Sequence, residues 1–114
     1  MIWDVKDLSA PSLVNSFYSP EEAIDHNLYV KDDIVYEANY CSGLRVLDAR
    51  RLVSEGDLNL KQIAFFDVAP NCQTTEFLGA WSSYPYFSSG TIVVNSIDRG
   101  LFVLHLDPSI LNVE

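Results

Sequence analysis

The sequence has few basic residues: seven Lys and Arg stand against sixteen Asp and Glu, which gives a formal net charge of -9 at pH 7. A protein that binds duplex nucleic acid needs a basic surface to neutralise phosphates, so the composition argues against that class. An anionic membrane surface is an unfavourable partner for the same reason. No apolar run approaches the roughly 20 residues of a membrane-spanning helix. We therefore expect no nucleic-acid partner and no insertion into a membrane.

Common catalytic and metal-binding motifs are also absent from the sequence. The five glycines are scattered, so no glycine-rich phosphate loop occurs, and there is no Gly-x-Ser-x-Gly motif. No spacing of His, Cys and carboxylates matches a zinc site or an EF-hand. The turn Asp32–Asp33 would need a further oxygen donor to hold calcium, and a solvated turn is the simpler interpretation. We predict no cofactor and no metal site, and we favour a protein that is not an enzyme.

The two ends of the chain carry organisational signals. The N-terminus has neither a basic n-region nor an apolar h-region, so a signal peptide is not expected. The strand-like segment Ile2–Val5 follows Met1 at once, and the apolar end, Ile110–Glu114, stops without a capping element. We expect a piece of a longer protein. The alternative is a complete small cytosolic β protein.

Short apolar and aromatic runs separated by turn residues predict an all-β chain, with one helix-like turn over Ala49–Ser54. The turns Lys31–Asp33 and Ser88–Gly90 predict hairpins. Strands are expected at Ile2–Asp4, Leu13–Tyr18, Leu28–Val30, Ile34–Tyr36, Leu44–Leu47, Gln62–Phe66, Tyr84–Phe87, Thr91–Val94 and Leu101–Leu104.

The pattern contains an internal repeat. Superimposing Gly43 on Gly100, a shift of 57 residues, aligns Ser42–Leu47 with Arg99–Leu104. A second shift, of 44 residues, lays Ile2–Val5 on Val46–Ala49. Four-stranded repeats of roughly 40 to 50 residues are typical of β-propeller blades. Two inserts, Ser54–Asn59 and Asp67–Ala80, account for the longer spacing.

These repeats predict a partial β-propeller. One complete four-stranded blade, residues 25–66, is flanked by two incomplete blades, residues 1–18 and 81–107. An open end leaves apolar blade faces exposed, so neighbouring blades are missing from this chain or an oligomer completes the ring. A small β-sandwich is the alternative architecture.

Several segments resemble the LVIVD-repeat proteins of the choice-of-anchor B family. They cover most of residues 1–107 and comprise Ile24–Val30, Ala38–Asp48, Gly79–Gly90 and Arg99–Val103. The resemblance implies a β-propeller that is secreted or held at the cell surface by a variable C-terminal anchor. The family has no well-established reaction, so it contributes no catalytic residues to this chain.

Propeller topology predicts which loops share an end of the molecule. Links between blades and loops from the second to the third strand lie together, and rigidly held loops often carry function. Asp67 and Asn71 are expected at this end. The candidate binding residues there are Asp25, His26, Asn27, Tyr40, Trp81, Asp98 and Arg99.

Asp25 and His26 form the densest polar cluster. His26 could serve as a metal ligand or general base with Asp25 orienting it. We favour the structural interpretation, in which neighbouring side chains diverge along a strand and His26 bonds to the adjacent blade. Trp81 is the platform candidate for a carbohydrate or peptide, whereas Tyr84–Phe87 is expected to pack between blades. His105 falls on a repeated, structural position.

Cys41 and Cys72 map to the same end of the predicted propeller. In a secreted protein they could form a disulfide closing a loop of about 30 residues, whereas in a reducing compartment they would stay free thiols. The leading functional hypothesis is a non-enzymatic extracellular or cell-surface scaffold that binds a protein or a glycan. The alternative is a hydrolase-type enzyme fragment with its site at the Asp25, His26 and Trp81 end of the channel.

Overall fold

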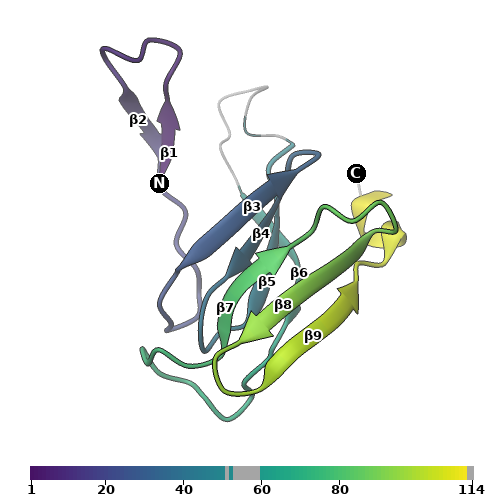
Figure 1. The fold of residues 1–114 in the computed structure, drawn as a ribbon. Helices are drawn as coiled ribbons and strands as arrows, with labels where there is room; N and C mark the ends of the chain where they lie inside the picture. The colour runs from purple at the N-terminus through teal and green to yellow at the C-terminus, as the bar shows by residue number, and fades with distance from the viewer. Residues whose placement is uncertain (51, 53–59, 113–114) are drawn as a thin grey trace.

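The computed structural model describes residues 1–50, 52 and 60–112, and these form an all-β fold of three antiparallel sheets (Figure 1). The first sheet pairs β1 (Ile2–Asp4) with β2 (Ser12–Asn15). The second has the order β3 (Asn27–Lys31), β4 (Ile34–Ala38), β5 (Leu44–Asp48), β6 (Lys61–Phe66). The third has the order β7 (Ala80–Tyr84), β8 (Thr91–Ser96), β9 (Gly100–His105), and a 3-10 helix, η1 (Pro108–Asn112), follows it.

The all-β prediction is confirmed, and each sheet joins strands that follow one another in the chain. The turn between β3 and β4 shows why: Asp32 and Asp33 have φ angles of 52° and 58°. Two successive left-handed residues form the primed turn that matches the twist of a tight hairpin, and Asp tolerates this conformation. Lys31 and Ile34 then face each other across the ladder.

Some strand boundaries differ from the predicted ones. The prediction of a strand at Tyr84–Phe87 was wrong, because β7 ends at Tyr84. Pro85 follows and has no N–H to continue a ladder. β2 ends at Asn15 instead of Tyr18. A hydrogen bond from the Leu52 N–H to the Ala49 carbonyl forms a turn, while the insert expected at Ser54–Asn59 lies outside the described residues.

The hydrophobic core lies between the second and third sheets. Alternate residues of β4, namely Ile34, Tyr36 and Ala38, point into it, as Ile92 and Val94 of β8 do. Val68 and Ala69, which follow β6, close one end. The β1–β2 hairpin projects away from this core (Figure 1), and its Trp3 is 48% exposed. None of the described helices is long and apolar enough to cross a membrane.

Candidate functional site

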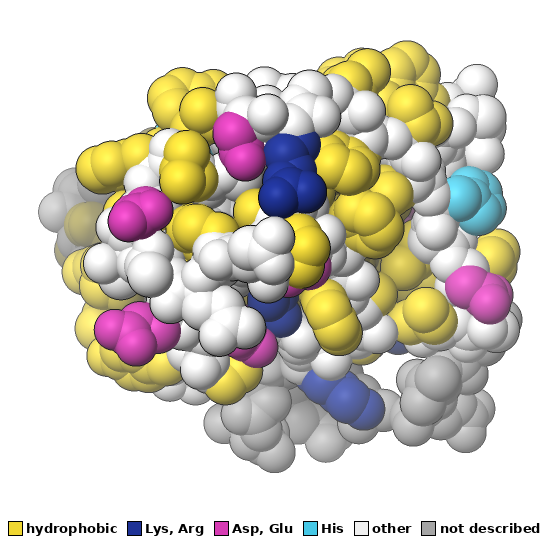
Figure 2. Space-filling model, turned by 90° about the horizontal axis from the view of Figure 1, so that it is seen from below, with side chains coloured by type: hydrophobic (Ala, Val, Ile, Leu, Met, Phe, Trp, Pro, Cys, Tyr) yellow, Lys and Arg dark blue, Asp and Glu magenta, His cyan; other side chains and the backbone are white. Residues whose placement is uncertain are grey.

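Four connections meet at one end of the two packed sheets, which we call the loop face. They are the β2–β3 link, the β4–β5 loop, the β6–β7 link and the β8–β9 turn, at the lower end of Figure 1. Figure 2 looks onto this face and shows hydrophobic side chains mixed with acidic ones and a few basic ones. All the candidate binding residues lie in these connections or in the strand ends beside them.

The main chain of the β4–β5 loop joins the second sheet to the third. Tyr40 has a φ of 43°, and its N–H and carbonyl pair with the carbonyl and N–H of Ala80 at 2.9 Å each. Gly79 precedes this bridge with a φ of 82°, and a Cβ there would lie 2.4 Å from the Tyr40 carbonyl oxygen. Only glycine fits so close to another backbone. The loop therefore holds Trp81, the next residue along β7, in a fixed position.

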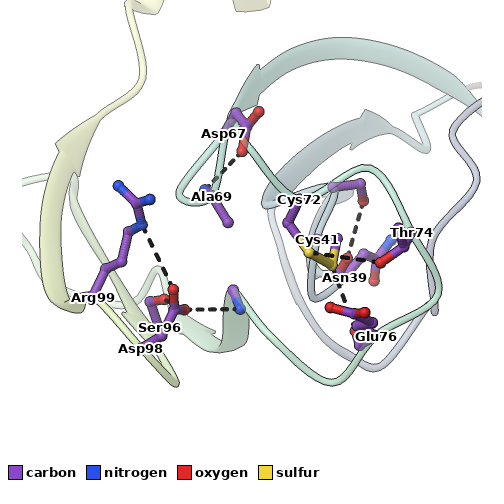
Figure 3. Close-up of a disulfide and its surroundings, with 12 residues drawn as sticks. Asn39, Cys41, Asp67, Ala69, Cys72, Thr74, Glu76, Ser96, Asp98 and Arg99 are labelled. Atoms are coloured by element: carbon purple, nitrogen blue, oxygen red, sulfur yellow. Dashed lines mark hydrogen bonds and ion pairs between the residues drawn. A yellow bond between two sulfur atoms is a disulfide. The ribbon is translucent and has the colours of Figure 1, made fainter.

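A disulfide between Cys41 and Cys72 fastens the β6–β7 link to the β4–β5 loop (Figure 3). The two Cα atoms are 5.1 Å apart, within the usual range for such a bond. The disulfide closes a loop across 31 residues of sequence. Of the two possibilities that the sequence left open, the structure therefore has the paired cysteines.

Four rings gather on the loop face, and we call them the aromatic cluster: His26, Tyr40, Phe77 and Trp81. The His26 ring lies 4.7 Å from Tyr40 and 4.8 Å from Trp81, and Tyr40 lies 5.3 Å from Phe77, measured between ring centroids. Tyr40 is buried, whereas Trp81 is 46% and Phe77 is 68% exposed. Tyr40 therefore supports the cluster from below, and its neighbours present the accessible surface.

A hydrogen bond fixes the orientation of the His26 ring. Its Nδ1 lies 2.8 Å from the carbonyl oxygen of Trp81. A carbonyl can only accept, so we assign the proton to Nδ1. In the neutral ring, Nε2 then carries a lone pair and can accept a hydrogen bond from a ligand.

Asn39 organises the polar residues beside the aromatic cluster. Its buried amide oxygen accepts the N–H of His26 at 3.1 Å, and its Nδ2 donates to Asp25 at 3.0 Å and Glu37 at 3.1 Å. Burial raises the pKa of Glu37; the Asn39 hydrogen bond counters this shift and the charge of Asp25 adds to it. Asp25 therefore pairs with an amide, and not with the imidazole of His26.

Three other candidate residues have partners within the protein. Asn27 donates from its Nδ2 to the Ser82 hydroxyl at 2.9 Å, which ties β3 to β7. The Asp98 carboxylate accepts the Ser96 hydroxyl at 2.9 Å and the Gly79 N–H at 3.1 Å, and these bonds lower its pKa (Figure 3). Arg99 lies 3.6 Å from Asp98.

Asp98 and Arg99 border an open hollow of about 340 Å³ under the β6–β7 link. Asn71, Thr74 and Glu76 of the link line its other side. The carboxylate of Asp98 is already engaged in holding the β8–β9 turn against Gly79. The hollow therefore offers Arg99 and the polar side chains of the link to a ligand, apart from the aromatic cluster.

The structure thus brings Asp25, His26, Tyr40 and Trp81 together, and it adds three residues that the sequence did not single out. Phe77 lies in an insert with no strand pattern, so no periodicity marks it. Glu37 lies near the end of β4 and Asn39 directly follows this strand, and alternation alone gives no sign that the carboxyl groups of Asp25 and Glu37 share the Asn39 amide.

Metal binding and relatives give no further assignment. Among the residues that the structure describes, no group of three or more His, Cys, Asp and Glu comes together to hold a metal ion. No family model, curated protein or solved structure matches the chain. The function must therefore be inferred from the geometry of the chain itself.

Proposed function

We propose that this chain is a non-enzymatic segment of a β-propeller that acts outside the cell or at its surface and binds a protein or a glycan through the loop face. Support for the blades comes from the two-, four- and three-stranded sheets, which follow one another in chain order. Gly43 and Gly100, which the repeat aligns, share φ values of 77° and 80° just before β5 and at the start of β9.

The observation that carries the binding role is the accessible indole of Trp81 on a rigid support. The Tyr40–Ala80 bridge fixes the backbone next to Trp81, and contacts with His26 and Tyr40 fix the indole ring. An exposed tryptophan held in one rotamer can stack on a sugar ring or a flat side chain without losing conformational entropy. Nε2 of His26 supplies a hydrogen-bond acceptor at its edge.

The alternative hydrolase has weaker support. A catalytic dyad needs a carboxylate that orients the imidazole, as in hydrolases that use a His base. Here the backbone carbonyl of Trp81 takes that place, and Asp25 is bound to Asn39. The two groups are adjacent in sequence but engage different partners, so the arrangement favours binding over acid–base chemistry.

The proposed compartment rests on the Cys41–Cys72 disulfide. Stable disulfides form in oxidising surroundings, such as the outside of the cell, and are rare in the cytosol. The acidic composition suits a soluble surface that repels anionic lipids and nucleic acids.

A panel of immobilised neutral oligosaccharides and neutral peptides without basic residues, probed with the labelled chain, tests the proposal. Trp81→Ala should weaken every genuine interaction at least about tenfold, since buried aromatic anchors dominate binding energy. Trp3→Ala is the matched control, because Trp3 is 48% exposed and Trp81 is 46% exposed. The proposal is contradicted if binding survives Trp81→Ala, or if the chain binds no member of the panel. Release of shortened oligosaccharides would instead favour the hydrolase.

A further inference from the structure

A second group of exposed rings lies at the end of the sheets opposite the loop face. The β3–β4 and β7–β8 turns meet there, at the upper end of Figure 1. Tyr29 of β3 contacts Tyr86 at 5.9 Å, Tyr86 contacts Tyr84 at 5.4 Å, and Tyr84 contacts Phe87 at 5.0 Å, all between ring centroids. We call these four residues the tyrosine patch. Each is between 37% and 45% exposed.

The structure holds these rings in place without any ligand. The Tyr86 hydroxyl donates to the Val30 carbonyl at 2.6 Å, and the Lys31 ammonium donates to the Pro85 carbonyl at 3.1 Å. Pro85 itself is fully buried. Folding has already ordered these rings, so they would lose little further conformational entropy when a partner binds, which favours binding.

The segment that carries the tyrosine patch combines the residue types that recognition surfaces use. Residues 84–91 read Tyr-Pro-Tyr-Phe-Ser-Ser-Gly-Thr. Tyrosine provides a large amphipathic contact area at low entropic cost, and serine and glycine adapt around it. The rings meet at 70° to 90°, so the patch presents ring faces at several angles instead of one flat platform. Such a surface suits side chains better than a sugar ring.

Charge selects among the possible partners. Asp32 and Asp33 are exposed in the turn that directly follows Lys31, whose ammonium bonds to the Pro85 carbonyl, so two carboxylates stand against one cation beside the tyrosine patch. The chain as a whole carries a net charge of -9. Electron-rich ring faces attract guanidinium and ammonium groups, and carboxylates beside them add to that attraction. The complementary partner is therefore basic.

We propose that the tyrosine patch docks a basic segment of a partner protein, with arginine side chains over the Tyr84 and Tyr86 rings and near Asp32 and Asp33. This proposal goes beyond the function proposed above, because it concerns the opposite end of the sheets and stands on different residues. It assigns the chain two separate contact surfaces.

The test titrates the chain with the peptide (Arg-Gly)3 and follows backbone amide shifts by NMR. Shifts should centre on residues 29–33 and 84–87. Tyr84→Ala should weaken binding at least about fivefold, because it removes an aromatic anchor. Asp32→Asn together with Asp33→Asn should also weaken it, and Asn keeps the left-handed turn.

Matched controls separate the patch from general electrostatics. Tyr18→Ala removes another exposed tyrosine, Glu22→Gln removes one exposed charge, and Trp81→Ala alters the loop face; all three should leave the affinity unchanged. The proposal is overturned if (Arg-Gly)3 does not bind, or binds the Tyr84→Ala chain as tightly as the original. It is also overturned if neutral maltohexaose occupies the patch in place of the peptide.

Discussion

The second and third sheets are built on the same sequence pattern but have different surroundings. Gly43 and Gly100 share nearly the same φ, yet a Cβ on Gly43 would lie 2.3 Å from the Phe66 carbonyl oxygen, whereas a Cβ on Gly100 would meet nothing within 4 Å. The difference is β6, which pairs with β5 and has no counterpart beside β9 among the described residues. The two glycines therefore share a backbone conformation, and the fourth strand of the second sheet accounts for the difference in their surroundings.

The loops of the two sheets are also held in different ways. The disulfide and the bridge to Ala80 fix the β4–β5 loop of the second sheet. The corresponding β8–β9 turn relies on Asp98, whose exposed carboxylate binds the Gly79 N–H. The bridge to Ala80 and the hydrogen bond from Gly79 to Asp98 both hold the start of β7. The strength of each fastening can be tested separately.

Removing the disulfide should destabilise the β4–β5 loop strongly. Replacing both Cys41 and Cys72 with Ala frees a loop spanning 31 residues, and the free energy of unfolding should fall by about 3 to 4 kcal/mol. Urea unfolding under oxidising conditions measures the change. A loss below about 1 kcal/mol would mean that the Tyr40–Ala80 bridge alone holds the loop.

The two glycines provide the next test. Gly43→Ala should cost about 1 to 2 kcal/mol for the left-handed backbone and a further 1 to 3 kcal/mol for the clash with Phe66. Gly100→Ala carries only the backbone cost of about 1 to 2 kcal/mol, because its surroundings are open. Chemical unfolding of both variants gives the difference. Equal losses would show that β6 does not press on Gly43 as described.

Much of the fold could be predicted from the sequence, because alternating apolar residues and turn residues mark most strands directly. β7 was misplaced, since Ala80–Tyr84 contains two serines and its position depends on the Tyr40–Ala80 bridge, a contact between residues 40 positions apart. The loop face was foreseen from topology. The favoured interpretation already had Asp25 and His26 pointing apart, but Asn39 as the partner of Asp25 was not predicted, because it depends on side-chain orientation that no local pattern encodes.

A smaller effect concerns how stability changes with pH. Burial raises the pKa of Glu37 in the folded chain, so the folded state binds this proton more tightly than the unfolded state. Stability should therefore fall as pH rises from the ordinary glutamate value, about 4.3, through the raised value. Glu37→Gln keeps an acceptor for Asn39 and should remove this fall. Urea midpoints between pH 4 and 8 measure it.

Asp98, in the β8–β9 turn, should show the opposite pH dependence. Hydrogen bonds from Ser96 and Gly79 lower its pKa, so the stability it contributes is present above the ordinary aspartate value and is lost as pH falls through the lowered value. Asp98→Asn should therefore be less stable than the original chain at neutral pH, and the gap should close in acid. Parallel profiles for both variants would contradict the account.

The central claim is that β9 forms an edge of the third sheet with no further strand beside it among the described residues, and that Leu101 and Val103 are 65% and 67% exposed there. Light scattering after size exclusion tests it most directly. An open apolar strand edge should drive association, so the mass should exceed the 12.8 kDa of one chain and rise with concentration. The double variant Leu101→Lys, Val103→Lys should restore the monomer. A monodisperse 12.8 kDa species for the original chain at every concentration would contradict the claim.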